Sequence, residues 1–277
     1  MIQNMGKSVQ DYLDRQNDNS YPKILIPQAI QKALIAKPEL KETERFSDFS
    51  FFMGALGVVS LFTPVGWIGM LGAGAAILYD ATEGYKERDV ETQKENEKAK
   101  EILSNPTLLQ NYMKSNLAET LSTNKPKLEI SDARLGKYDN TLLMALRKIP
   151  NCIVKSGEGL NLGYTFTPDV IIHVPSLNLW IDVEVDEPWF VNELGEKQPI
   201  HYIGKDRYRD ERFLQSNWVV FRFAEEQVAN QAMSCTKEIA EFLQLFDINV
   251  SSKFYSVPQL KKVKFWTEEE AVNKSRY

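Results

Sequence analysis

Cysteine is scarce in this chain of 277 residues. The two cysteines, Cys152 and Cys235, are far apart and belong to no CxxC or Cys/His pattern, so the sequence indicates neither a disulfide framework nor a zinc site. This usage fits a reducing, cytoplasmic compartment. Residues 1–20 also lack a basic start followed by an apolar core, so they do not predict a secretion signal.

An excess of positive charge is also missing. The chain has 33 Lys and Arg against 38 Asp and Glu, a formal net charge of −5 and a pI near 5.3. Nothing in this balance attracts a polyanion globally, so contact with nucleic acid requires a local basic patch. A hydrophobic content of 43% and a charged content of 26% are typical of soluble folded proteins and exclude disorder of the whole chain.

Charged residues are absent from Phe49 to Tyr79. As a helix this stretch would exceed the roughly 30 Å hydrocarbon core of a bilayer, but Pro64 divides it into two arms that are each short for a full span. Small residues at helical spacing favour helix pairing: Gly54, Gly57, Gly66, Gly69, Gly72 and Gly74. Three arrangements stay open, namely one kinked membrane span, a shallow re-entrant hairpin, and a buried hairpin in a soluble protein or oligomer.

Composition changes divide the chain into three parts. Residues 80–104 carry eight acids and five bases at helical spacing and predict a solvated helix. A loop at 122–127 then marks a boundary. The sequence therefore predicts a helical region over 1–127 with an apolar segment at 49–79, an α/β domain over 128–250, and a basic C-terminal tail over 251–277.

Hydrophobic periodicity in the second part predicts a mixed α/β fold. The expected elements are a helix at 138–148, strands at 152–155, 164–174 and 177–186, a helix at 205–216, a strand at 218–223, and helices at 224–230 and 236–246. The order is helix, three strands, helix, strand, helix.

An acidic strand carries the candidate chemistry. In Trp180–Asp186, alternation places Asp182, Glu184 and Asp186 on one face, and a hairpin with the preceding strand brings Asp169 beside Glu184. A bound divalent cation such as Mg²⁺ would relieve the repulsion between these carboxylates. The alternative is an ordinary solvent-exposed strand face that carries acidic residues without a bound ion.

Basic residues downstream supply candidate substrate contacts. Lys205 and Arg209 are four positions apart and can point the same way, while His201 titrates near working pH and can act as a general base or acid, or as a structural hydrogen bonder. The tail has a local charge of +3, which favours nucleic-acid contacts through Lys261, Lys262 and Lys264. The neighbouring pair Phe265-Trp266 either stacks on nucleic-acid bases or packs on the domain.

These residues together resemble a known family. Asp169 after a proline and Glu184 in an apolar strand are similar to the PD-(D/E)xK, or restriction-endonuclease-like, nuclease superfamily, whose core has the same order of helices and strands. The segments GlyLysAspArgTyrArgAsp at 204–210 and PheLeuGlnSerAsnTrpValValPheArgPheAlaGlu at 213–225 resemble very-short-patch-repair-like endonucleases. The resemblance covers residues 132–246.

The resemblance implies roles for individual residues. Asp169 and Glu184 would bind Mg²⁺ or Mn²⁺, with the Val185 carbonyl as a further ligand. Asp139 stands where the superfamily often has a helical Glu. The usual catalytic lysine is replaced by Asp186, so either Lys205 supplies the positive charge or the site is altered.

We therefore expect a metal-dependent endonuclease that hydrolyses phosphodiester bonds, with DNA favoured over RNA by the resemblance. Together with the apolar segment, this predicts a defence effector at the inner face of a membrane, or a subunit of a homo-oligomer or larger complex. The alternative from another class is a membrane-inserting or scaffold protein whose nuclease-like domain only binds nucleic acid or a partner, and Asp186 is its best support.

Overall fold

The computed structural model describes residues 8–16, 18–41, 89–133, 136–246 and 251–275. The chain forms two compact units, one made of residues 1–36 and 113–277 and the other of residues 37–112. In the second unit residues 89–104 are helical, and Asn96 exchanges hydrogen bonds with the backbone of Lys41. This confirms the described part of the charged helix predicted for residues 80–104.

The apolar segment predicted at 49–79 lies outside the described residues. Within the part of the chain that the structure does describe, no helix combines the length and the apolar character needed to cross a membrane.

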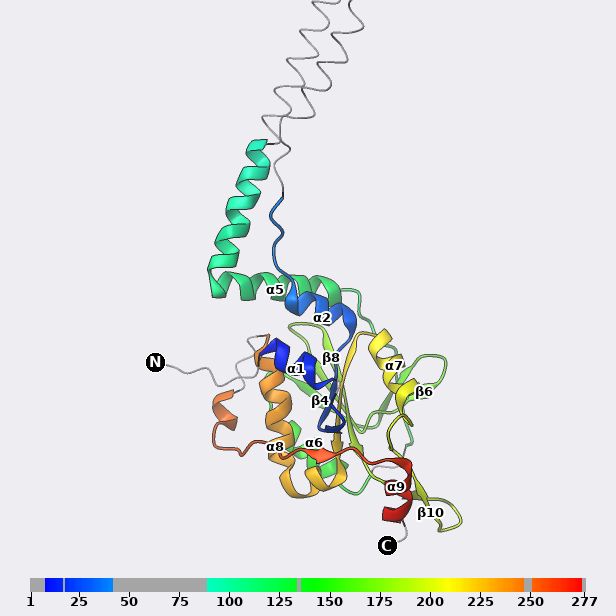
Figure 1. The fold of residues 1–277 in the computed structure, drawn as a ribbon. Helices are drawn as coiled ribbons and strands as arrows, with labels where there is room; N and C mark the ends of the chain where they lie inside the picture. The colour runs from blue at the N-terminus through cyan, green and yellow to red at the C-terminus, as the bar shows by residue number, and fades with distance from the viewer. Residues whose placement is uncertain (1–7, 17, 42–88, 134–135, 247–250, 276–277) are drawn as a thin grey trace, which may run out of the picture. The chain divides into compact units, whose positions relative to one another are not determined.

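A five-stranded mixed sheet forms the centre of the first unit (Figure 1). Its strands, in spatial order, are β2 (Lys23–Leu25), β11 (Trp218–Ala224), β8 (Leu179–Asp186), β7 (Val170–Val174) and β4 (Ile153–Lys155). β8 and β11 run parallel, and every other neighbouring pair is antiparallel. The predicted mixed α/β class is therefore confirmed.

Two helices cover one face of this sheet, as Figure 1 shows: α6 (Asp139–Leu146) and α8 (Glu225–Gln244). Alternation along β8 sends Ile181, Val183 and Val185 into the core beneath them. The helices predicted at 224–230 and 236–246 are the two halves of α8, which kinks at Gln231 where φ is −143° and ψ is 39°.

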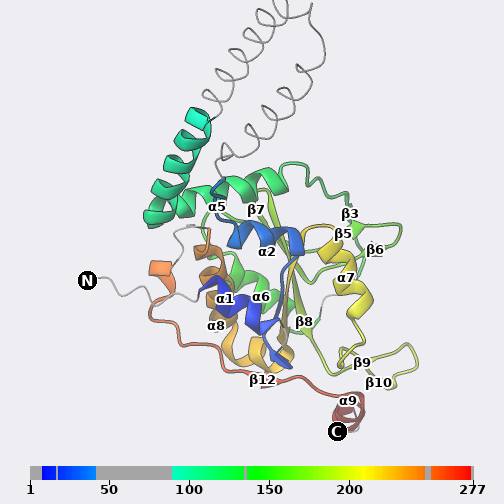
Figure 2. The ribbon, with the colours of Figure 1, turned by 45° about the horizontal axis from the view of Figure 1, so that its top comes forward.

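The opposite face is covered by α7 (Arg207–Gln215) and by a small second sheet, which lie side by side in Figure 2. That sheet consists of β3 (Leu128–Ile130), β5 (Glu158–Asn161) and β6 (Thr165–Phe166). The strand predicted at 164–174 is thus divided into β6 and β7 around Pro168, which has no N–H to donate to a ladder. β5 lies between the strands predicted at 152–155 and 164–174 and was not predicted.

The N-terminal residues belong to this same unit rather than to a separate helical region. β2 pairs antiparallel with β11, and α1 (Val9–Arg15) and α2 (Gln28–Ile35) add Tyr12 and Ile30 to the core, which also holds Leu117 and Leu121 of α5 (Pro106–Leu121). The predicted boundary at residue 127 therefore differs from the observed division. A three-residue strand whose partner lies almost 200 positions away gives no local signal of that pairing.

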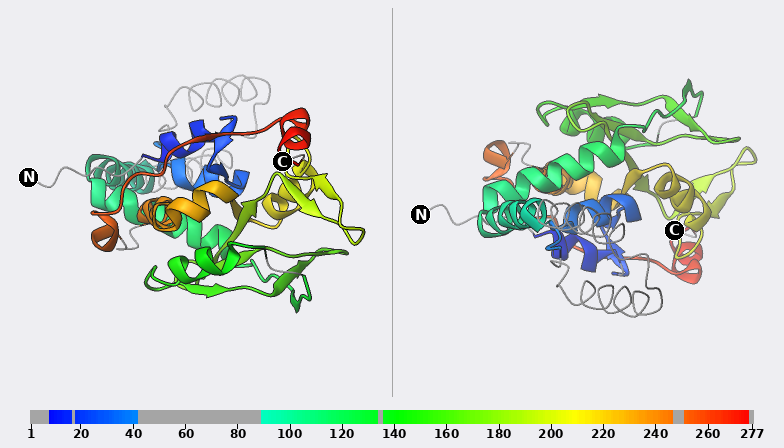
Figure 3. Two further views of the ribbon diagram at one scale, coloured as in Figure 1. Left: turned by 90° about the horizontal axis from the view of Figure 1, so that it is seen from below. Right: turned by 90° about the horizontal axis from the view of Figure 1, so that it is seen from above.

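The C-terminal residues fold onto the unit as well. After the short helix η2 (Ser251–Phe254), β12 (Val263–Lys264) pairs with β1 (Ser20–Tyr21), and the Phe265 ring stacks on Tyr21 at 4.3 Å between centroids. The final helix, α9 (Glu268–Ser275), packs against the hairpin of β9 (Trp189–Val191) and β10 (Lys197–Pro199) (Figure 3). Of the two roles predicted for Phe265-Trp266, the structure shows packing.

The contribution of β2 to the core can be measured. Ile24 is fully buried, so we expect Ile24→Ala to lower the free energy of unfolding by about 2–5 kcal/mol in a denaturant titration. Ile35→Ala is the matched control because that side chain is 57% exposed, and it should change the free energy little. Equal effects of the two variants would contradict the placement of β2 in the core.

Candidate active site

The polar face of β8 carries three carboxylates that are almost completely buried. Asp182 and Asp186 are 0% exposed and Glu184 is 5% exposed. Strand alternation brings them to one face, as predicted, but α7 and the loop before it cover that face. The alternative of a solvated acidic face is therefore wrong, and each buried charge needs a partner.

Arg209 of α7 is the partner of the first two carboxylates. Its Nη1 donates to Asp182 Oδ2 at 2.7 Å, and its Nη2 donates to Glu184 Oε1 at 2.6 Å. Because a guanidinium presents several donors in one plane, a single side chain can bridge both acids. Arg209 therefore fixes the orientation of Glu184 while neutralising part of its charge.

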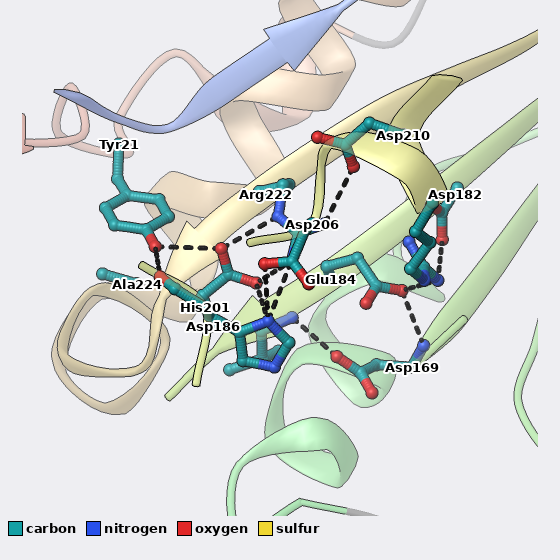
Figure 4. A network of polar contacts seen from close by, with 12 residues as sticks. Tyr21, Asp169, Asp182, Glu184, Asp186, His201, Asp206, Asp210, Arg222 and Ala224 are labelled. Atoms are coloured by element: carbon teal, nitrogen blue, oxygen red, sulfur yellow. Dashed lines mark hydrogen bonds and ion pairs between the residues drawn. The ribbon is translucent and has the colours of Figure 1, made fainter. Parts of the chain in front are cut away.

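Arg222 of β11 is the partner of the third carboxylate. It is 1% exposed, and its Nε and Nη2 donate to the two oxygens of Asp186 at 2.9 and 2.6 Å. Its Nη1 donates to Asp210 at 2.9 Å, and the Tyr21 hydroxyl donates to Asp186 Oδ2 at 2.9 Å. Figure 4 shows Arg222 among these groups. The network joins the N-terminal segment to β8, β11 and α7.

His201 lies at the edge of this network. Its Nδ1 is 2.9 Å from Asp206 Oδ2 and 3.1 Å from Arg222 Nη2. Burial lowers its pKa, but the charge of Asp186 and the contact with Asp206 outweigh burial, so the net pKa is raised. Its Nε2 makes no hydrogen bond with the described residues and can exchange a proton with a bound molecule.

Asp186, His201 and Asp206 could hold a metal ion, since one ligand atom of each lies within 4.8 Å of the others. However, Arg222 Nη2 lies 2.6 Å from Asp186 and 3.1 Å from Asp206, so the guanidinium already supplies the positive charge. A metal ion at this point would meet a buried cation at close range, which costs free energy. We therefore assign these residues to the ion-pair network.

Asp169 and Glu184 lie side by side at the end of the β7–β8 hairpin, as Figure 4 shows. The Asp169 N–H donates to Glu184 Oε1 at 3.3 Å, and the Val185 N–H donates to Asp169 Oδ2 at 2.7 Å. The hairpin thus brings the predicted pair together. Within the described residues, neither Asp169 Oδ1 nor Glu184 Oε2 has a hydrogen-bond partner. Two carboxylate oxygens therefore remain available to a cation.

Two further carboxylates approach this pair from the start of α6 and the end of β8. The Gly136 N–H donates to Asp139 Oδ2 at 2.5 Å, whereas Asp139 Oδ1 is buried without a partner among the described residues. A Cβ at Gly136 would lie 2.6 Å from Glu187 Oε1 and 2.8 Å from Asp139 Oδ1. Only glycine leaves room here for both oxygens.

The acids of this cluster bind protons unusually tightly. Burial raises the pKa of Asp169 to about 7, and the charge of Asp139 adds to that effect. Burial and the charge of Asp139 likewise raise the pKa of Glu187 to about 7. Burial also raises the pKa values of Asp139 and Glu184, although Arg209 acts in the opposite direction on Glu184. A bound divalent cation would reverse these shifts.

Lys205 does not supply the charge that the lysine position lacks. Its ammonium lies over the Tyr202 ring, 5.7 Å from the centroid, and the cation that pairs with Glu184 is Arg209.

Two of the three tail lysines predicted to contact nucleic acid already form ion pairs within the protein. Lys262 pairs with Asp18 at 2.5 Å, and Lys264 pairs with Glu270 at 2.8 Å. Lys261 has no ion pair among the described residues.

Sequence reasoning missed Arg222, Glu187 and Tyr21. A signal existed for Arg222, since a lone arginine in the apolar strand Trp218–Ala224 requires a buried counter-charge. No such signal exists in the sequence for Glu187, because this residue follows three alternating acids and precedes a proline. Tyr21 became relevant only through pairing across the sheet.

Comparison of the chain with protein-family models, with curated proteins and with solved structures finds no match.

The contribution of the buried ion-pair network to stability can be tested at Arg222. Arg222→Met removes the guanidinium and leaves Asp186 and Asp210 without it, so we expect the free energy of unfolding to fall by about 3–5 kcal/mol in a urea titration. The control is Arg207→Met, because Arg207 is exposed and pairs with Glu211 at the surface. A loss at Arg222 as small as at Arg207 would contradict a structural role for the network.

The raised pKa values predict a pH dependence of stability. The ordinary pKa values of Asp169 and Glu187 are 3.8 and 4.5, and both rise to about 7 in the folded protein. Between about pH 4 and 7 the folded state therefore binds more protons than the unfolded state, and these groups make stability fall as pH rises. With EDTA present, we expect a smaller fall for Asp169→Asn than for the wild type in urea titrations at about pH 5 and 8.

The control for this measurement is Asp132→Asn, at an exposed position. It should reproduce the wild-type fall in stability. If Asp169→Asn and the wild type gave parallel curves, the proposed protonation of Asp169 in the folded state would be refuted.

Proposed function

We propose that this protein is a Mg²⁺- or Mn²⁺-dependent nuclease whose metal site is built on Asp169 and Glu184. The observation that carries the proposal is the pairing of the buried Glu184 with the partly buried Asp169, in which one oxygen of each accepts hydrogen bonds and the other has no partner among the described residues. Hard divalent cations prefer such oxygen ligands, and Mg²⁺ typically binds through one or two carboxylates together with water and substrate phosphate. Asp139, whose Oδ1 has no partner among the described residues, adds a further acidic group close to the pair.

The arrangement of the first unit supports the proposal. Apart from β5, β6, β9 and β10, which belong to smaller sheets, the elements from α6 to α8 follow the order α6, β4, β7, β8, α7, β11, α8, which agrees with the core of the PD-(D/E)xK superfamily that the sequence resembles. In that reading the site lies at the end of the β7–β8 hairpin, with Asp139 contributed by the first helix. The Val185 carbonyl remains a predicted further ligand, and the Val185 N–H already orients Asp169.

The chemistry follows from the groups present. A divalent cation, when bound, lowers the pKa of a water and stabilises charge on a phosphate oxygen. Arg209 holds Glu184 in place and adds positive charge next to the site, the part that the resemblance assigns to a lysine. His201 can move a proton through Nε2 while Asp206 orients the ring through Nδ1.

Asp186 favours a second candidate function. It stands at the position of the usual catalytic lysine but forms a buried ion pair with Arg222, so its side chain stabilises the fold. If Arg209 cannot replace the lysine, the domain binds nucleic acid or a protein partner without cleaving it. The segment at 49–79 would then direct the protein to a membrane or to a larger complex.

DNA is the proposed substrate, on the strength of the resemblance alone. Electrostatic attraction would come from local groups, since the chain as a whole is acidic. Lys261 is the tail lysine best placed for it, while Lys262 and Lys264 would exchange exposed ion pairs for phosphate contacts. Exposed ion pairs contribute little to the free energy of folding, so breaking them to contact phosphate costs little free energy.

The decisive experiment measures cleavage of plasmid and single-stranded DNA by the full chain with Mg²⁺, Mn²⁺ or EDTA. We expect metal-dependent cleavage that Glu184→Gln lowers by at least about 100-fold, because the variant loses a charged ligand but keeps its shape. Circular dichroism would show that the variant is folded. The control, Glu226→Gln, changes an exposed acid and should cleave like the wild type.

Two further variants separate the candidate cations. Lys205→Ala should keep its activity, whereas Arg209→Lys should lose much of it because a single ammonium cannot bridge Asp182 and Glu184. Absence of cleavage with every metal, together with retained DNA binding, would favour the binding function instead.

A further inference from the structure

The candidate active site holds more negative charge than its described cations balance. Asp169 contacts Glu184, Asp139 and Glu187 both lie against Gly136, and the charge of Asp139 acts on Asp169 and Glu187, so the four acids form one cluster. Arg209 pairs with Glu184, but none of the ion pairs within the described residues involves Asp139, Asp169 or Glu187. One cation on Asp169 and Glu184 would still leave the buried Asp139 and the partly buried Glu187 without a cation among the described residues.

Asp139 and Glu187 both approach Gly136 on the side where a Cβ would stand. Each has an oxygen less than 3 Å from the point where a Cβ of residue 136 would stand, 2.8 Å for Asp139 Oδ1 and 2.6 Å for Glu187 Oε1. The two oxygens are therefore separated by at most about 5.4 Å, a gap that one divalent ion with ligand distances of about 2.0–2.6 Å can nearly span.

Asp139 Oδ1 gives independent evidence of a missing partner. The side chain is only 2% exposed, and this oxygen has no hydrogen bond within the described residues although Oδ2 accepts from Gly136. A buried carboxylate oxygen without a partner is costly, so native proteins rarely keep one unless an ion or a water occupies the position. The orphaned oxygen lies on the same side of Gly136 as Glu187.

We propose that Asp139 and Glu187 form a second divalent-cation position next to the one on Asp169 and Glu184. The proposal rests on the proposed nuclease function and assigns Glu187 a role that neither the sequence pattern nor the resemblance gave it. Glu187 follows β8 directly, so the strand that presents Glu184 to one ion presents Glu187 to the other. Two carboxylate-held ions can clamp both the attacking and the leaving oxygen of a phosphodiester.

The competing explanation is that Asp139 and Glu187 share a proton, as two carboxyls in close contact often do. Burial raises both pKa values, and the charge of Asp139 adds to the rise at Glu187, which is compatible with either state in the absence of metal. Measurements at about pH 8 separate the two, because that pH lies above the pKa of about 7 of Glu187, so its carboxylate is then available to an ion.

The test is a Mn²⁺ titration of the full metal-free chain at about pH 8, by calorimetry and by electron paramagnetic resonance of free Mn²⁺, without nucleic acid. We expect two ions per wild-type chain. Glu187→Gln should weaken one of them by at least about tenfold and leave the other, whereas Glu184→Gln should weaken the other. Glu193→Gln, at an exposed position, is the control and should bind as the wild type does.

Gly136→Ala provides a variant that keeps all four carboxylates. Its methyl group would meet Glu187 Oε1 and Asp139 Oδ1, so we expect it to weaken the same ion as Glu187→Gln does. A thermal melt without metal would show whether each variant folds.

The outcomes distinguish the two proposals. A single Mn²⁺ that is lost in Glu184→Gln and unaffected by Glu187→Gln would overturn the second position and leave the nuclease proposal standing. Two ions with DNA cleavage absent would support the second position and refute the enzyme. No Mn²⁺ binding at all would overturn both.

Discussion

The structure of the first unit depends on how the charges of β8 are neutralised. Three acids alternate along one strand and are all buried, so their face can be covered only if cations are buried with them. Arg209 and Arg222 satisfy this requirement from two different elements, α7 and β11. The charge balance therefore fixes where α7 lies over the sheet and why a central strand such as β11 contains an arginine.

The same constraint ties the two ends of the chain to the sheet. Tyr21 donates to Asp186, which is the carboxylate that Arg222 holds, and Phe265 of the C-terminal segment stacks on the Tyr21 ring. Gln227 at the start of α8 also donates to the carbonyl groups of Tyr21 and Lys261. One buried network thus organises segments that are more than 200 residues apart in sequence, and the ends of the chain complete the domain.

Two neighbouring acid clusters differ in charge balance, and this difference distinguishes the acids that stabilise the fold from the acids that we propose bind a cation. Around Arg222, both oxygens of Asp186 accept from donors, Asp206 and Asp210 are each paired through one oxygen, and the ring of His201 lies at the edge. Around Asp169, carboxylate oxygens are left over, and burial raises the pKa of Asp169 to about 7. A satisfied cluster stabilises the fold, whereas an unsatisfied one is maintained at a cost in stability and is therefore the better candidate for binding a cation.

The sequence determined the local features of this protein. Period-two alternation placed Asp182, Glu184 and Asp186 on one face of β8, and the expected hairpin with the preceding strand placed Asp169 beside Glu184, because both follow from short-range backbone geometry. Helical periodicity likewise located α6, α7 and both halves of α8.

Only the tertiary structure decided which charges meet. In the folded protein Arg209 rather than Lys205 pairs with Glu184, Asp186 pairs with Arg222, Glu187 lies beside Asp139 next to Gly136, and β2 forms an edge of the sheet. These outcomes depend on contacts between residues distant in sequence and on the cost of burying an unpaired charge. That cost exists only once the chain has folded and water has been excluded, so a local pattern can indicate that a buried charge needs a partner but not which residue supplies it.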